Sequence, residues 1–126
     1  MDWNISLNGE TALIVGGTRN IGLSIAEAIK GAGANVCIVG GSDYSVMKTA
    51  LTQLQKSNGQ SMGLIADISD ENAVSSAFQE CEEKLGPVSI LVNGPGFRPH
   101  GPFTDITLDT WNAVMSIMLT GPFITS

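Results

Sequence analysis

The sequence has few of the residues that build metal clusters, disulfide frameworks and nucleic-acid interfaces. Its 126 residues include two cysteines, one histidine and one tyrosine, with six basic side chains against twelve acidic ones. The two cysteines, Cys37 and Cys81, are too few for a disulfide framework or a thiolate metal site, and we expect both to be reduced and structural. The formal charge of −6 disfavours contact with phosphate backbones and anionic membranes. We therefore expect no nucleic-acid partner, no membrane and no metal.

Long apolar runs and a leader pattern are also missing. The longest apolar runs, such as residues 12–15, fall far short of the roughly 20 residues that cross a bilayer. The start of the chain is acidic and shows no basic region followed by an apolar stretch, so we expect no secretory signal and a cytoplasmic location. A hydrophobic content of 43% over this length instead predicts one globular domain with a single core.

Short apolar runs alternate with helical periodicity along the chain. This alternation is typical of βαβ units and predicts an α/β fold with a parallel sheet. A first helix is expected over residues 21–30, a second ends near residues 57–59, and Ser69 is the expected N-cap of a third. Thr107 or Asp109 is expected to cap a fourth, with a kink or break near Pro122. The predicted strands cover residues 11–15, 35–39, 61–66 and 88–92.

A glycine-rich turn joins the first strand to the first helix. Glycines allow a pyrophosphate to approach the backbone, and the free N–H groups of the first helical turn attract anions. A triphosphate-binding loop would need Lys followed by Ser or Thr after the last glycine, whereas this chain has Leu23 and Ser24. A dinucleotide is therefore the better expected ligand.

At these residues the chain resembles the short-chain dehydrogenase/reductase family. The family's turn usually reads Thr-Gly-x-x-x-Gly-x-Gly, and here the segment from Val15 reads Val-Gly-Gly-Thr-Arg-Asn-Ile-Gly. Asp67-Ile68 stands where the family has a pair that contacts adenine, and the segment 93–96 reads Asn-Gly-Pro-Gly in place of Asn-Asn-Ala-Gly, with Trp111 following at a family-like separation. The resemblance implies that residues 1–126 form the N-terminal part of one NAD(P)-binding, Rossmann-like doubly wound domain, with strand order 3-2-1-4. The cofactor-binding residues it implies are Gly16, Thr18, Arg19, Asn20, Ile21, Gly22, Asp67, Ile68, Asn93, Gly94 and Gly96.

The activity that the resemblance implies is hydride transfer between a secondary alcohol and a ketone, with NAD or NADP as cofactor and a small-molecule substrate. Hydroxyacyl thioesters are one candidate substrate class. The end of the second strand, Gly40-Gly41-Ser42, offers neither an acidic residue for the ribose hydroxyls of NAD nor a basic one for the phosphate of NADP. Arg19 in the turn would meet a 2′-phosphate, so NADP is slightly favoured. A competing interpretation of Asp67 is that it only shapes a turn.

The chain departs from the family pattern at several positions. Val15 replaces a threonine, Asn20 replaces a glycine, Pro95 removes a backbone donor and Met118 replaces an asparagine. The change at Asn20 is mild, but Val15, Gly94-Pro95 and Met118 together favour a degenerate subunit that works beside an active paralogue. Two alternatives stay open: an active homo-oligomer whose Ser, Tyr and Lys lie beyond residue 126, or a non-enzymatic module that senses a nucleotide.

Three further features have alternative interpretations. Tyr44 and Lys48 reproduce a Tyr-x-x-x-Lys spacing, but the second helix that carries them is expected to pack away from the substrate cleft. We therefore assign no catalytic role to either residue. His100 and Arg98 are expected to be solvated loop residues, the alternative being contact with the nicotinamide or with an anionic substrate. With a sheet of only four strands, the last predicted helix would expose apolar residues to water. This surface predicts a homo- or hetero-oligomer, a dimer or tetramer, whose interface includes that helix. These apolar residues are Trp111, Val114 and Met115.

Overall fold

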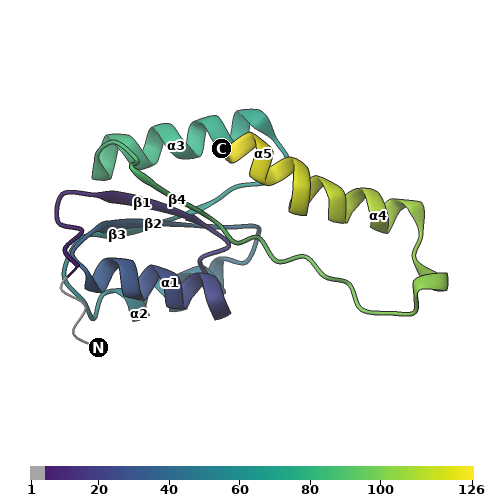
Figure 1. The fold of residues 1–126 in the computed structure, drawn as a ribbon, viewed down its shortest axis with the longest axis horizontal. Coiled ribbons are helices and arrows are strands. Elements are labelled where there is room, and N and C mark those ends of the chain that lie inside the picture. Colours follow the sequence, from purple (N-terminus) through teal and green to yellow (C-terminus); the bar gives the residue numbers. More distant parts are fainter. Residues whose placement is uncertain (1–4) are drawn as a thin grey trace.

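Four parallel strands form the centre of the molecule in the computed structural model, which describes residues 5–126 (Figure 1). The strands lie in the order β3-β2-β1-β4, so the predicted order is confirmed. All three pairs are parallel, and the register places Val15 beside Val39 on one side and beside Asn93 on the other. The carboxyl ends of β1, β2 and β4 therefore meet at one edge of the sheet. The strands are β1 (Thr11–Val15), β2 (Asn35–Gly40), β3 (Ser61–Ile65) and β4 (Ile90–Asn93).

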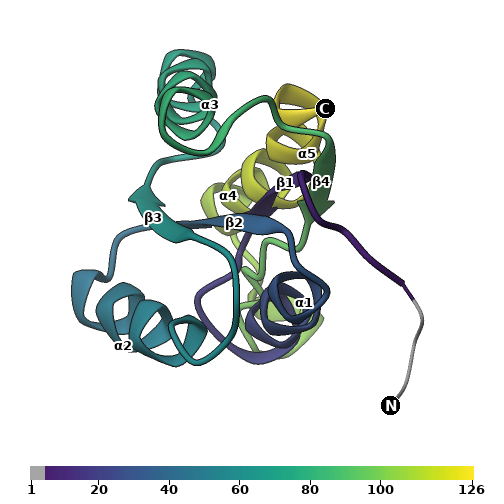
Figure 2. The same ribbon diagram turned by 90° about the vertical axis from the view of Figure 1, so that its left-hand side faces the viewer.

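Helices cover both faces of the sheet (Figures 1 and 2). On one face lie α1 (Asn20–Gly31) and α2 (Tyr44–Leu54), and on the other lie α3 (Glu71–Leu85) and α5 (Gly121–Thr125). A long loop after β4 contains the short 3-10 turn η1 (Phe103–Asp105) and leads into α4 (Leu108–Met115). Figure 1 shows that this loop and α4 project beyond the carboxyl ends of the strands. The result is the α/β/α layering that the sequence predicts.

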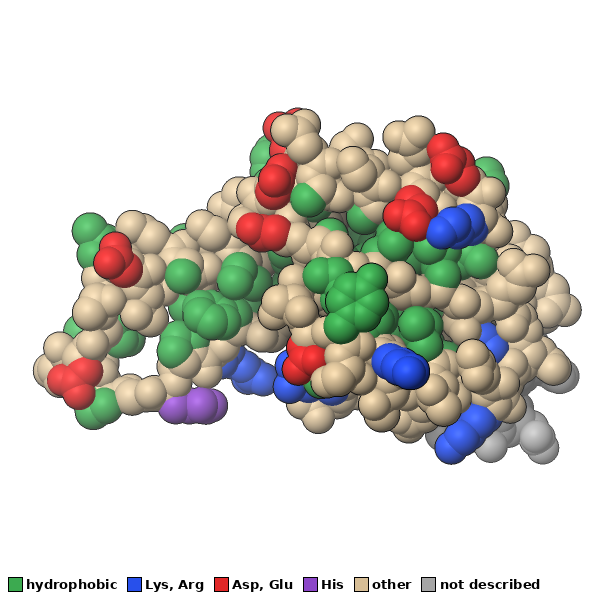
Figure 3. All heavy atoms as spheres, turned by 180° about the vertical axis from the view of Figure 1, so that it is seen from behind, with side chains coloured by type: hydrophobic (Ala, Val, Ile, Leu, Met, Phe, Trp, Pro, Cys, Tyr) green, Lys and Arg blue, Asp and Glu red, His purple; other side chains and the backbone are tan. Residues whose placement is uncertain are grey.

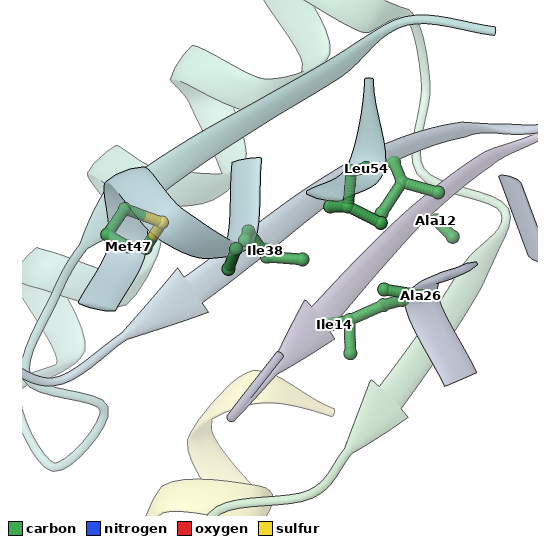
Figure 4. Packing of buried hydrophobic residues seen from close by; sticks show 8 residues of the cluster. Ala12, Ile14, Ala26, Ile38, Met47 and Leu54 are labelled. Carbon is green, nitrogen blue, oxygen red and sulfur yellow. The ribbon is translucent and has the colours of Figure 1, made fainter. Parts of the chain in front are cut away.

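The central strands are buried on both faces, which explains their unbroken hydrophobicity. Every residue of β1 is buried, and its side chains alternate between two clusters. Ala12 and Ile14 pack against α1 and α2, as Figure 4 shows, together with Ile38 of β2. Leu13 and Val15 pack on the opposite face, toward α3.

The two cysteines lie in the second of these clusters. Cys37 of β2 and Cys81 of α3 are both free and fully buried. A hydrogen bond with Cys81, together with burial, raises the pKa of the Cys37 thiol, so this thiol stays uncharged. Their expected structural role agrees with these positions.

Aspartate caps two of the helices, and one predicted cap is wrong. Ser69 was expected to cap α3, but the cap is Asp70, whose carboxylate accepts from the amides of Asn72 and Ala73 at 2.9 and 3.3 Å. Ser69 instead donates its amide and hydroxyl to Asp67. Both residue types make good caps, and the turn that Asp67 starts shifts the helix start by one position. At α4, Thr107 is the cap, one of the two candidates.

The irregularity expected near Pro122 lies one turn earlier than the proline. Residues Ser116–Thr120 form a π-helical turn, η2, between α4 and α5. Proline has no N–H to donate to the preceding turn, and a π-turn is one way in which a helix accommodates the missing bond. Directly after this turn, Gly121 lies so close to Ile68 that a Cβ on the glycine would lie 2.6 Å from the isoleucine Cδ1.

Two kinds of feature are absent from residues 5–126. None of the helices described there is long and apolar enough to cross a bilayer. Within the same residues, histidine, cysteine and carboxylate side chains form no group of three or more that could hold a metal ion.

Candidate functional site

The glycine turn after β1 is tightly packed backbone. Gly16 has a φ of 76°, in the left-handed region that favours glycine, and a Cβ there would overlap the carbonyl oxygen of Gly94 and lie 2.7 Å from its carbon. A Cβ on Gly22 would overlap the carbonyl oxygen of Gly16. Asn20 also has a positive φ, 53°, a conformation that asparagine tolerates better than most residues other than glycine. The turn therefore brings bare backbone to the surface at the start of α1.

The amino end of α1 differs from those of the other long helices in the described chain. Asp43 caps α2, Asp70 caps α3 and Thr107 caps α4, each through a side-chain oxygen. At α1 the N-cap is Arg19, which forms no side-chain cap, and the first turn contains no acidic residue. The first N–H groups of a helix have no partner within the helix, and together with the helix dipole they favour an anion. A phosphate group would supply the missing acceptor.

The loop after β4 lies directly against this turn. The amide of Gly94 donates to the carbonyl of Val15 at 3.0 Å, and the amide of Gly16 donates to Val39 at 2.9 Å. Gly94 therefore lies next to the glycine turn at the open edge of the sheet, and Gly96 is exposed two residues further along the loop. The backbones of three strands thus converge on Gly16.

Asn93 at the end of β4 contacts a different partner. Its Oδ1 accepts from the Thr125 hydroxyl at 2.6 Å, and its Nδ2 donates to the Ser126 hydroxyl at 3.2 Å. Thr125 is buried, so the bond ties β4 to the end of α5. In this structure the Asn93 side chain orders the base of the loop.

Asp67 and Ile68 follow β3 at the same edge of the sheet. The Asp67 carboxylate accepts from the Ser69 hydroxyl at 2.6 Å and from the Ser69 amide at 2.9 Å, and these bonds lower the pKa of Asp67. Its local role is therefore the turn that the alternative interpretation described, and the side chain is exposed. Ile68 is buried against Gly121, so contact with a nucleotide would have to come from its backbone.

Asp43 is a charged neighbour of the glycine turn that was not among the predicted site residues. It lies three residues after the end of β2, just beyond the uncharged segment Gly40-Gly41-Ser42. Hydrogen bonds from Ser45 and Val46 lower the pKa of Asp43, and the nearby Arg19 guanidinium lowers it further. The available signal was an aspartate immediately before a helical pattern, the usual sequence of an N-cap. Arg19 thus has an acidic neighbour at the edge of the glycine turn.

The remaining predicted positions lie apart from this turn or on its outer surface. Thr18 is half-buried, and its Cγ2 lies 2.9 Å from the place of a Cβ on Gly40. Ile21, in the first turn of α1, is 74% exposed. Tyr44 is exposed at the start of α2 with Lys48 one turn on, while Arg98 and His100 are exposed in the loop after β4.

The family model for short chain dehydrogenases matches residues 10–126. The chain belongs to the short-chain dehydrogenase family. It is 28% identical over 120 residues to 2-dehydro-3-deoxy-D-gluconate 5-dehydrogenase of Formosa agariphila, covering 95% of this chain and 46% of that protein. The chain is also 33% identical over 121 residues to D-beta-hydroxybutyrate dehydrogenase of Cupriavidus necator, covering 95% of this chain and 46% of that protein.

Solved structures of short-chain dehydrogenases share the fold. A putative short-chain alcohol dehydrogenase from Sinorhizobium meliloti superposes with a TM-score of 0.87 at 32% identity, covering 95% of this chain and 47% of that one. A blue fluorescent protein from a metagenomic library, solved in complex with NADPH, superposes with a TM-score of 0.85 at 30% identity. The match covers 95% of this chain and 49% of that one. The chain spans about half the length of these relatives. The resemblance seen at the glycine turn is thereby confirmed, together with the oxidoreductase family that it implies.

Proposed function

We propose that the protein is an NAD(P)-dependent oxidoreductase that interconverts a secondary alcohol and a ketone, and that residues 1–126 form its dinucleotide-binding half. The observation that carries the proposal is the uncapped amino end of α1 beside Gly16, Gly22 and Gly94. Neighbouring backbone excludes side chains at Gly16 and Gly22, so a pyrophosphate would meet bare amide groups. The cofactor, when bound, supplies the hydride chemistry.

The chain's own residues bind and orient the cofactor in this proposal. The amides of the first turn of α1 donate to the pyrophosphate, and Gly94 and Gly96 leave the adjacent backbone accessible beside the ribose. Asn93 holds the loop at the end of β4 through Thr125, so the base of the loop is ordered before the cofactor arrives. The NADPH complex of the metagenomic blue fluorescent protein, which has the same fold, supports a nicotinamide dinucleotide as the ligand.

A slight preference for NADP over NAD is part of the proposal. Arg19 is exposed at the turn and would pair with a 2′-phosphate, while residues 40–42 supply no carboxylate for a free ribose hydroxyl. Asp43 near Arg19 reduces this preference because it competes for the same guanidinium.

The site is tested by changing the charge of the helix terminus without touching the packed glycines. Ile21 is exposed, so Ile21→Asp leaves the core intact, and a carboxylate at a helix amino end favours the helix itself. The same carboxylate repels a pyrophosphate. In calorimetric titration of the full-length protein, Ile21→Asp should weaken NADPH binding at least tenfold, and the neutral control Ile21→Asn should bind within threefold of wild type. Equal binding by the two variants would refute this placement of the cofactor.

A degenerate subunit beside an active paralogue is the second candidate. Met118 supports it, because a thioether cannot donate the hydrogen bonds of the asparagine that is usual there, and Pro95 supports it by removing an amide beside the ribose. Purified full-length protein that binds NADPH but oxidises no secondary alcohol until the paralogue is added would favour this form. Turnover by the protein alone would favour an active homo-oligomer.

We also propose that another subunit covers the apolar surface around α4 and α5. Trp111 is 53% exposed, and Leu108, Leu119 and Phe123 are more exposed still. Apolar surface of this kind on adjoining helices is typical of an interface.

A further inference from the structure

The basic side chains are distributed unevenly over this acidic protein. Both arginines and the only histidine belong to segments at the carboxyl end of the sheet: Arg19 in the glycine turn, Arg98 and His100 in the loop after β4. Arg98 follows Gly94 by four residues, which limits its Cα to about 14 Å from the point where the loop touches the glycine turn. The loop therefore carries a guanidinium and an imidazole on the same side of the sheet as the proposed cofactor site.

The loop and α4 together enclose an opening. Figure 3 shows a gap in this part of the molecule, with the histidine at its lower margin, basic side chains farther along toward the body of the molecule, and apolar side chains above. The exposed apolar residues of the loop include Phe97 and Ile106. An apolar wall facing a few donors is the usual composition of a small-molecule site.

Arg98 and His100 have no partner within the described part of the molecule. Across residues 5–126 the one ion pair joins Lys84 to Glu80, and no hydrogen bond there involves either loop side chain. The acidic residues of the same region are Asp105, whose Oδ1 accepts from Thr104 at 3.5 Å, and Asp109 in the first turn of α4. Neither is paired with Arg98, so its guanidinium keeps its full donor capacity.

We propose that Arg98, supported by His100, binds an anionic group of the alcohol substrate, a carboxylate or a phosphate. A guanidinium presents two parallel N–H groups to such an oxyanion, and imidazole has at least one N–H to donate in either protonation state. The inference rests on the proposed function, because it places the anion in the opening beside the cofactor. It restricts the substrate to a hydroxy acid or a phosphorylated alcohol and makes Arg98 a specificity-determining residue.

Protection from phenylglyoxal, an arginine-directed reagent, tests this without requiring turnover. Arg19 and Arg98 are the two arginines of the segment, and peptide mass spectrometry of the modified full-length protein separates them. NADPH should protect Arg19, which reports on the proposed function. In the presence of NADPH, 3-hydroxybutyrate, gluconate or glycerol 3-phosphate should slow labelling of Arg98 at least fivefold, while methyl 3-hydroxybutyrate and glycerol at equal ionic strength should not.

Each outcome decides one of the two proposals. Protection of Arg98 by a carboxylate but not by the phosphate, or the reverse, supports the inference and identifies the anion. No protection by any of the three anions, or equal protection by the neutral analogues, overturns it while leaving the protection of Arg19 to judge the cofactor site.

A kinetic variant provides a second readout where the protein turns over. Arg98→Gln should raise KM for the protecting acid at least tenfold with a smaller change in kcat, and should leave its methyl ester within threefold. Lys56→Gln, at the opposite end of the sheet, is the matched control and should alter neither. Equal losses for the acid and the ester in Arg98→Gln would contradict a role in anion recognition.

Discussion

Gly16→Ala should destabilise the protein through two separable effects. The first is conformational, because an L-residue at a φ of 76° costs about 1–2 kcal/mol. The second is steric, because the new Cβ would overlap the Gly94 carbonyl and lie 3.1 Å from the nitrogen of Pro95. Overlap with backbone forces β1 and the loop after β4 apart, which by analogy with overpacked cores costs about 1–3 kcal/mol. The sum is about 2–5 kcal/mol.

Gly9→Ala isolates the first effect. Gly9 has a φ of 85°, close to that of Gly16, but a Cβ there would meet nothing within 4 Å. This control should therefore lose only about 1–2 kcal/mol. Gly31→Ala, at the end of α1 with an open site and no positive φ, should be neutral or gain roughly 0.4–1 kcal/mol.

Equilibrium urea unfolding of the full-length protein, at one fixed concentration, measures all three variants. With a slope of about 1–3 kcal/mol per molar urea, the midpoint of Gly16→Ala should fall on the order of 1 M further than that of Gly9→Ala. NADPH binding should be lost at Gly16 and retained at Gly9. Equal midpoints for the two variants would refute the claim that the approach of Gly94 sets the geometry of the turn.

Three further substitutions test a helix cap, a buried charge and an exposed apolar side chain. Asp70→Ala should cost about 1 kcal/mol of unfolding free energy by removing the cap of α3, whereas Ser69→Ala should cost less; the reverse order in urea unfolding would restore Ser69 as the cap. Burial lowers the pKa of Lys30, so the unfolded chain binds more protons just below pH 10.5, and wild type should gain stability relative to Lys30→Met as pH rises toward 10.5. A flat difference across that range in unfolding experiments would contradict the effect of burial. Phe123→Glu should weaken self-association or association with the paralogue in sedimentation experiments without lowering the unfolding midpoint of the subunit, because Phe123 is 81% exposed.

The sequence predicted the strands well because burial on both faces leaves an unbroken apolar run. All of β1 and most of β2 were recognised in this way, and the order of the strands followed from the family resemblance. Helix starts were less certain, because neighbouring Asp and Ser residues are nearly equivalent caps. Asp70 caps α3 because Ser69 already donates its amide to the Asp67 carboxylate. The periodicity of apolar residues carries no information about this contact between side chain and backbone.

Parts of the site depended on contacts between distant segments and could not be read from local patterns. The approach of Gly94 to Gly16 joins two segments about 80 residues apart, and it appears only once β4 is paired with β1. The nearness of Asp43 to Arg19 likewise requires the end of β2 to lie beside the glycine turn. Sequence patterns located the residues, whereas the sheet determined which of them meet.

At Val15 the chain lacks one side-chain hydrogen bond of the family pattern, and other hydrogen bonds keep the loop after β4 in position. The family resemblance implies a threonine at this position, whose hydroxyl helps to fix the glycine turn to the fourth strand. Val15 is instead buried on the α3 side, and its backbone carbonyl still accepts from Gly94 at 3.0 Å. Its register partner Asn93 is held by Thr125 and Ser126 from the end of α5. Because two hydrogen bonds from α5 fix Asn93, the loop after β4 keeps its place against Gly16 without the missing hydroxyl, and the departure at Val15 is compatible with cofactor binding.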